Sequence, residues 1–122
     1  MTKDKAIYRF LSQLMDFYPV SSVPDDVVFP YGTYELPMGA LDSGPLSMTV
    51  NLWFYTESEA IPNAKAQELS EMIGYGGKVI ECDGGYIWIR RGTPFCVSQS
   101  DAEKKEVKLR YINITVEYLT KN

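Results

Sequence analysis

The side chains that most often do chemistry in enzymes are scarce in this sequence. Its 122 residues include no histidine, the commonest general base and the commonest zinc ligand. Histidine-dependent hydrolases, metalloproteases and zinc deaminases are therefore excluded. The only cysteines, Cys82 and Cys96, are too few for a structural zinc site, and we expect two free thiols instead of a disulfide. The sequence predicts no catalytic residue, no cofactor, no metal and no enzymatic activity.

Two short acidic runs are the best candidates for binding a divalent cation. They are Asp25-Asp26 and Asp101-Ala102-Glu103. Calcium and magnesium prefer carboxylate oxygens, so either run has suitable ligands. Both runs lie in polar segments, where neighbouring acids are usually solvated. We therefore interpret them as exposed loop carboxylates.

A glycine-rich run, Gly74-Tyr75-Gly76-Gly77-Lys78, has the composition of a phosphate-binding loop. In that motif the loop follows a strand, and its lysine leads into a helix. Here a helix is predicted before the run and a strand after it. We interpret the run as a helix C-cap followed by a chain reversal.

The charge balance argues against a nucleic-acid binder. Sixteen acidic and twelve basic residues give a net charge of −4, and Lys or Arg residues occur together only as the pairs Arg90-Arg91 and Lys104-Lys105. A protein that binds the phosphate backbone needs a basic face to displace counterions. The N-terminal segment is interrupted by polar residues, so we expect neither a signal peptide nor a membrane span, and a cytoplasmic location.

Hydrophobic periodicity predicts the elements of the first half of the chain. Apolar residues at helical spacing predict an amphipathic helix from Lys5 to Tyr18. Residues 19–31 are rich in proline and serine, which favours irregular backbone. A short strand is expected at 33–36, and strict alternation predicts a strand over 46–55 with one apolar face. That face comprises Leu46, Met48, Val50, Leu52 and Phe54.

In the second half, a helix is predicted over 58–73 and a strand over 78–82. Asp83-Gly84-Gly85 then reverses the chain into a strand that Gly92 and Pro94 should end. A further short strand is expected at 95–98, and a polar loop at 99–105. In the last strand, 106–119, the apolar residues change from odd to even positions, which predicts a bulge or bend near 110–112, or two halves with different neighbours.

This order of elements predicts a single α+β domain over residues 1–122. Its sheet should be mainly antiparallel and flanked by two helices. We find neither an internal repeat nor a low-complexity tract.

Aromatic and arginine side chains on the strand after Asp83-Gly84-Gly85 suggest a contact surface. Tyr86, Trp88 and Arg90 should share one face, opposite Ile87 and Ile89. Interface cores are enriched in aromatic residues and arginine, although Trp88 fits core packing equally well. With the start of the last strand, the candidate subunit-interface residues are Tyr86, Trp88, Arg90, Arg91, Phe95, Val107, Leu109 and Tyr111.

Three segments carry a resemblance to a known family. They are residues 29–35 (FPYGTYE), 83–95 (DGGYIWIRRGTPF) and 111–119 (YINITVEYL). In order and spacing the chain resembles the small tail-completion or tail-terminator proteins of long-tailed bacteriophages and prophages of Gram-positive bacteria. The shared pattern consists of aromatic residues, glycines and prolines.

The resemblance implies a structural virion-assembly protein that caps the tail tube and joins it to the head connector. It further implies self-association into a hexameric ring, through which DNA passes without specific binding. The protein would then be found in the bacterial host cytoplasm during assembly and in the tail or neck of the virion, with no membrane partner. A related head-tail connector or neck subunit fits the same residues.

A second hypothesis is a small-molecule-binding or other interaction domain of a mobile element. Its pocket would lie between the helix at 58–73 and the sheet. Tyr31, Tyr34 and Glu35 would be its polar groups.

Overall fold

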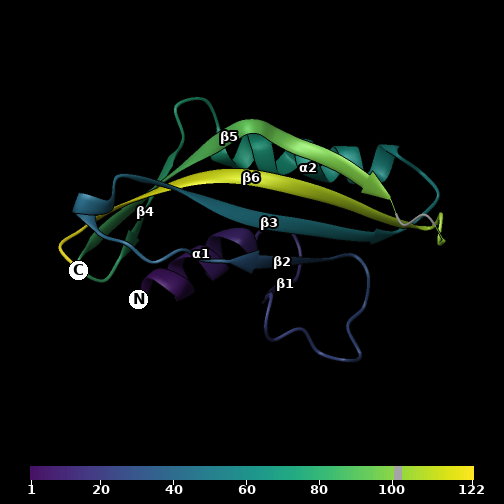
Figure 1. The fold of residues 1–122 in the computed structure, drawn as a ribbon, viewed down its shortest axis with the longest axis horizontal. Helices are drawn as coiled ribbons and strands as arrows, with labels where there is room; N and C mark the ends of the chain where they lie inside the picture. The colour runs from purple at the N-terminus through teal and green to yellow at the C-terminus, as the bar shows by residue number, and fades with distance from the viewer. Residues whose placement is uncertain (101–102) are drawn as a thin grey trace.

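The computed structural model describes residues 1–100 and 103–122, and it confirms an α+β fold. One sheet has the strand order β1-β2-β3-β6-β5-β4, and all neighbours are antiparallel except β1 and β2 (Figure 1). The elements are α1 (Lys3–Leu11), β1 (Phe17–Pro19), β2 (Tyr31–Glu35), β3 (Pro45–Tyr55), α2 (Ala60–Ile73), β4 (Lys78–Cys82), β5 (Gly85–Ser100) and β6 (Val107–Thr120), with a short 3-10 turn at Leu41–Ser43.

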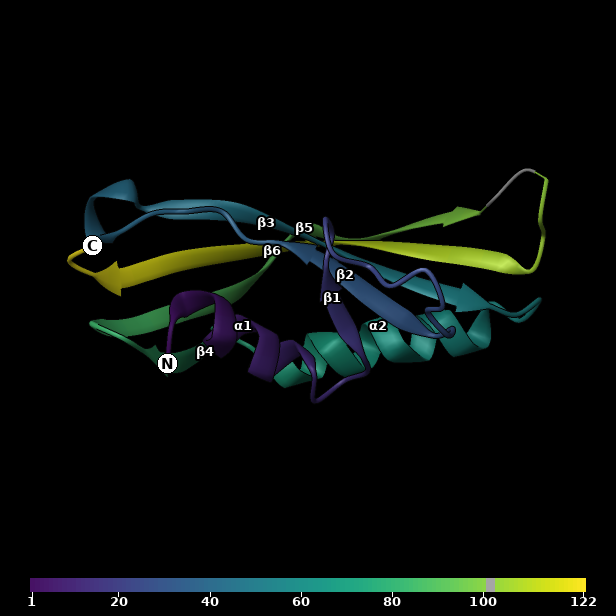
Figure 2. The same ribbon diagram turned by 90° about the horizontal axis from the view of Figure 1, so that it is seen from below.

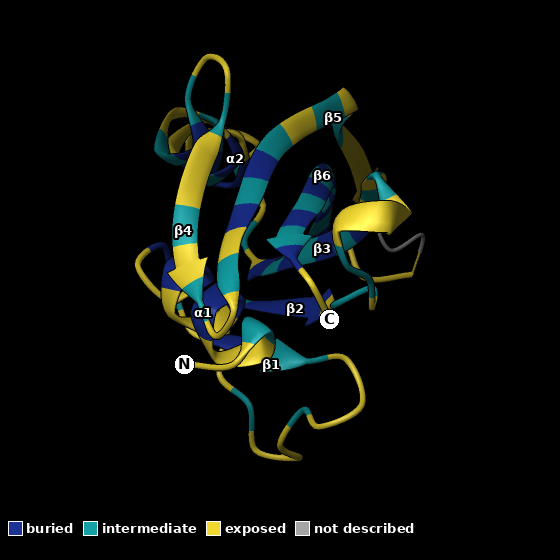
Figure 3. Cartoon of the chain, turned by 90° about the vertical axis from the view of Figure 1, so that its left-hand side faces the viewer, coloured by how far each residue is buried: buried dark blue, intermediate teal, exposed yellow. Residues whose placement is uncertain are grey.

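Both helices lie on the same side of the sheet, which curls toward them (Figure 2). The core fills the concave side of this curl. Its central strand residues come from β3, β5 and β6, where buried segments alternate with less buried ones (Figure 3), and the two helices add apolar side chains. The apolar face predicted for residues 46–55 is confirmed. Four of its five residues are buried, namely Met48, Val50, Leu52 and Phe54, and Leu46 is partly buried. Neither helix is long and apolar enough to cross a membrane.

The first helix is shorter than its apolar pattern predicts. α1 ends at Leu11, and a turn follows in which the Leu14 N–H donates to the Leu11 carbonyl at 3.0 Å. Phe17–Pro19 then form β1 and pair in parallel with β2. Leu14 and Phe17 are buried as the pattern suggests, but from a turn and a strand. Burial alone therefore did not distinguish a longer helix from this arrangement.

The second helix and its exit agree with the sequence. α2 ends at Ile73, and the Gly74 N–H donates to the Ser70 carbonyl at 2.9 Å. The chain then turns directly into β4. Because the order is helix, loop and strand, the glycine-rich run serves as a helix cap and a chain reversal.

The bulge predicted in the last strand is absent from β6. Burial alternates without interruption from Val107 to Thr120, so the backbone keeps one phase along the whole strand. What changes is residue type, because Lys108 and Arg110 occupy buried positions on the concave side. The prediction was wrong since it assumed that only apolar residues face the core.

The irregularity lies in β5 instead. The expected break at Gly92 and Pro94 does not end the strand, which continues to Ser100. The pairing of β5 with β6 nevertheless shifts in register between Arg91 and Cys96. The glycine and proline therefore mark a bulge, a position where both residues are tolerated within a sheet.

Candidate functional site

The side of the sheet that faces away from both helices is the candidate functional site, and we call it the convex face. Neither helix packs against it (Figure 2). On β6 it carries the odd-numbered residues, because the even-numbered ones are buried on the concave side. Cross-strand pairing extends it to Trp53 on β3, opposite Leu109, and to Trp88 on β5, opposite Glu117.

Six of the eight predicted interface residues share this face. Alternation and pairing place them there together: Tyr86, Trp88, Arg90, Val107, Leu109 and Tyr111. The other two lie elsewhere. Arg91 points to the helix side, where its Nη1 donates to Ser70 Oγ at 3.0 Å, and Phe95 is partly buried against the core at the bulge.

Trp88 and Arg90 form a stack at one end of the convex face. The Arg90 guanidinium carbon lies 3.8 Å from the centre of the Trp88 ring, and its Nη2 donates to Glu117 Oε1 at 2.8 Å. Trp88 Nε1 donates to the Gly76 carbonyl at 3.0 Å. Trp88 is therefore held by the adjacent loop and by Arg90, half-buried outside the core.

A second group of rings lies at the other end of the face, and we call it the aromatic cluster. Tyr31 stacks on Trp53 with ring centres 6.3 Å apart, and Phe29 lies 5.3 Å from Tyr31 and 5.9 Å from Tyr55. Tyr18 completes it at 6.3 Å from Tyr31. Burial raises the pKa of Tyr31 above its usual range. Tyr55 nevertheless leaves 63% of its surface exposed.

The aromatic cluster is not among the interface residues predicted from the sequence. On β3, Trp53 is half-buried and donates to Thr33 Oγ1 at 3.4 Å. The sequence does indicate that Trp53 and Tyr55 face away from the core, because they alternate with the apolar residues of β3. What the sequence lacked was the register that sets Tyr31 opposite Trp53.

On the concave side, the two buried basic residues of β6 meet the start of α2. Arg110 Nη2 donates to Glu59 Oε2 at 2.5 Å, and its Nε donates to Asn63 Oδ1 at 3.1 Å. Lys108 Nζ lies 3.7 Å from Glu59 Oε1. The hydrogen bond from Arg110, with the charges of Arg110 and Lys108, lowers the pKa of Glu59. This cluster joins helix to sheet.

The pocket predicted between the second helix and the sheet is not formed by its proposed residues. Tyr31 lies on the convex face, whereas Tyr34 is buried on the concave side and donates to Asp4 Oδ1 at 3.1 Å. Burial, and then Asp4, raise the pKa of Tyr34 to about 12. Glu35 is exposed. Tyr34 points to the opposite face of β2 from Tyr31 and Glu35, so the three side chains do not line one pocket.

A groove of about 750 Å³ does exist, between α1, the end of α2 and β4. Phe10, Met72 and Ile80 supply its apolar lining, while Arg9 and Lys78 add positive charge. It is an open groove, and its residues come from α1, the end of α2 and β4, three segments that no pattern in the sequence links.

The acidic runs and the two cysteines noted in the sequence do not come together in one site within the described residues. Asp25 and Asp26 are exposed, and no group of three potential metal ligands gathers in residues 1–100 and 103–122. Asp101 and Ala102 lie outside the described residues. Cys82 and Cys96 are free thiols, and burial raises the pKa of both.

Comparisons of the chain with protein-family models, with curated proteins and with solved structures found no match.

Proposed function

We propose that this protein is a structural virion-assembly protein, which forms a ring on the head-proximal end of a phage tail tube and joins the tube to the head connector. The three segments that carry the family resemblance support this proposal together. Residues 29–35 contribute Phe29 and Tyr31 to the convex face, residues 83–95 contribute Trp88 and Arg90, and residues 111–119 begin with Tyr111.

The observation that carries the proposal is the uncovered convex face. A sheet in a single domain usually packs its apolar and aromatic side chains against another layer. Here one face carries the aromatic cluster at one end, beside Leu109, and the Trp88–Arg90 stack at the other, with Tyr111 between them. Aromatic residues and arginine are the types enriched at interface cores.

The charge of the chain fits the same role. A ring at the end of a tail tube must let DNA pass without holding it, and a net charge of −4 disfavours binding to phosphates. A head-tail connector or neck subunit would make the same use of these surfaces. Tail termination and neck assembly are therefore two forms of one proposal.

The test uses a tail-tube protein taken from the same genome as this chain. Purified protein is mixed with tubes of that protein, and the tube ends are imaged by negative-stain electron microscopy. We expect density at one end of each tube and tubes that stop growing. The free protein need not form rings, because ordering loops on contact costs conformational entropy. Absence of the protein from the ends of its own tubes would overturn the proposal.

The groove between α1 and β4 favours a second candidate function, a small-molecule-binding domain. Its volume of about 750 Å³ lies within the range of ligand pockets. Screening small molecules by thermal shift tests this candidate, with Phe10→Ala as the variant that should lose any response. A monomer that ignores tail tubes and is stabilised by a ligand through Phe10 would favour it.

A further inference from the structure

The charges of the chain separate along the sheet. Residues 10–64, which run from the end of α1 through β1, β2 and β3 into the start of α2, contain seven acidic side chains and no Lys or Arg. Residues 78–122, which include β4, β5 and β6, contain eight basic and six acidic side chains. Since the strand order is β1-β2-β3-β6-β5-β4, the acidic and basic segments occupy opposite halves of the sheet.

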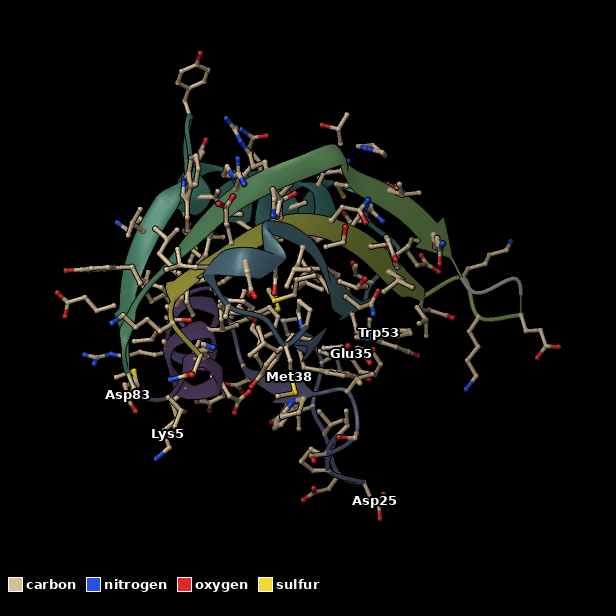
Figure 4. All side chains as sticks on the ribbon, turned by 60° about the vertical axis from the view of Figure 1, so that its left-hand side comes forward. Lys5, Asp25, Glu35, Met38, Trp53 and Asp83 are labelled. Carbon is tan, nitrogen blue, oxygen red and sulfur yellow. The ribbon has the colours of Figure 1, made fainter. Side chains whose placement is uncertain are left out.

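The carboxylates of the acidic half are available to a partner. Among these seven, only Glu59 lies within ion-pairing distance of a basic side chain that the structure describes. The loop 20–30 extends beyond β1 and β2 and carries Asp25 and Asp26, both exposed (Figure 4). This loop reaches Phe29, so the acidic edge adjoins the aromatic cluster. Charge and exposed rings thus occur together at one end of the molecule.

The opposite half offers an open strand edge with positive charge. β4 pairs with β5 only as far as Ile89, where it meets Lys78. From Arg91 to Gln99, β5 pairs with β6 alone among the described strands, which leaves its other edge without a strand partner in residues 1–100 and 103–122. Lys78 and Arg91 stand where this open edge begins, and neither has a carboxylate within 4.0 Å in the described part of the chain. β5 itself contains two arginines and no acidic residue.

The two surfaces lie on different sides of the molecule. In Figure 1, β5 runs along the upper margin and the loop 20–30 hangs below β1 and β2. A contact between two different surfaces of identical chains is heterologous, and repeated heterologous contacts close into a ring when the rotation allows it. An isologous pair through either surface alone would instead bring like charges together.

We infer that copies of this chain associate head to tail, with the acidic 20–30 loop and aromatic cluster of one copy against the open β5 edge, Lys78 and Arg91 of the next. This inference rests on the proposed ring and names the surfaces that build it. The partner is a second copy, because the same chain carries both halves of a complementary pair. Complementary charge would set the orientation, and the rings would supply buried apolar area.

Charge reversal tests the contact. The variants are Arg91→Glu and the double variant Asp25→Lys with Asp26→Lys, each checked for folding by circular dichroism. Assembly is measured by sedimentation velocity, or on tail tubes if the free protein stays monomeric. Each variant alone should associate at least about tenfold more weakly than wild type, because like charges then face each other. Lys5→Glu is the matched control, since it makes the same charge change on an exposed residue of α1.

Mixing the two variants gives the sharper result. In an alternating ring every contact would then pair opposite charges again, so the mixture should recover assembly that neither variant has alone. If Arg91→Glu unfolds, Lys78→Glu replaces it on the same edge. This inference would be overturned if each charge-reversed variant assembled as well as wild type, or if the mixture of the two variants did not recover assembly. Either result would leave the ring proposal standing. Wild-type protein that neither self-associates nor binds tubes would instead defeat the proposed function.

Discussion

Arg110 is a charged side chain buried among the mainly apolar residues of the core. Only 1% of its surface is exposed, and its carboxylate partner is Glu59 at the start of α2. A buried charge that loses its partner is strongly destabilising, because the desolvated ion then stands alone. The pair therefore fixes the start of the helix against β6, a role that residue type alone did not reveal.

The lowered pKa of Glu59 gives this contact a pH dependence. A carboxyl whose pKa is depressed in the folded state stabilises the fold above its unfolded pKa, and that stability is lost as the pH falls through the folded value. We expect Glu59→Gln to be less stable than wild type at neutral pH and to lose less stability on acidification below about pH 4. Denaturant midpoints measured across this range test it, with the exposed Glu57→Gln as control. Parallel pH profiles in wild type and Glu59→Gln would contradict the pairing.

Leu52 and Ile114 test the concave core directly. They lie on the central strands β3 and β6 with 0% and 1% of their surface exposed. Truncation to alanine should lower the free energy of unfolding by about 2 to 5 kcal/mol in each case, because a close-packed core relaxes only partly around the cavity. Chemical denaturation measures this, and Ser47→Ala on the exposed side of β3 is the control. Midpoints close to wild type would mean that these side chains are not in the core.

At the scale of elements, the loop between α2 and β4 depends on close backbone approach. A Cβ at Gly77 would lie 2.4 Å from the Ile89 carbonyl oxygen and 2.7 Å from Trp88 Nε1, and its φ is +94°. Gly76 has a φ of +81°, but nothing lies within 4 Å of a Cβ there. The two glycines share a backbone preference and differ in the space around them.

Gly77→Ala should therefore be less stable than Gly76→Ala. Both substitutions incur the strain of positive φ, about 1 kcal/mol or more, and only Gly77→Ala adds a clash with the backbone of β5. Thermal melts of the two variants measure the difference, and tryptophan fluorescence should change with Gly77→Ala as Trp88 is displaced. Equal melting temperatures would show that the loop moves away from β5 without cost.

Substitutions in the Trp88–Arg90 stack are poor tests of assembly, because the stack also stabilises the fold by linking β5 to β6 and to the loop before β4. Glu at position 90 would face Glu117 in place of an ion pair at 2.8 Å, and Ala at position 88 would remove the ring beneath Arg90 and the hydrogen bond to Gly76. Such variants should lose stability as well as contacts. Assembly is better tested from the aromatic cluster, where the rings are more exposed.

At the scale of the whole molecule, local pattern predicted more than long-range pairing. Alternation located β3 and its buried face, and glycines located the end of α2 and the turn into β5. Three features of the structure were not predicted from the sequence, because each depends on contact with a segment distant in the chain. The parallel pairing of β1 shortened α1, Glu59 allowed Arg110 into the core, and the register of β2 on β3 built the aromatic cluster. A single sequence contains the residues of such contacts but not their pairing.

The aromatic cluster allows binding to be separated from folding. Tyr55 is 63% exposed and contacts the Phe29 ring at 5.9 Å, so Tyr55→Ala should leave the melting temperature near that of wild type. If the convex face is the interface, the same change should weaken ring formation or tube attachment by at least about tenfold, as expected when an aromatic anchor is removed. Tyr8→Ala is the matched control, because Tyr8 is 46% exposed on α1, on the other side of the sheet. Tube attachment is measured by co-sedimentation over a range of protein concentrations. A Tyr55→Ala protein that attaches as well as the Tyr8→Ala control would place the interface away from this end of the convex face.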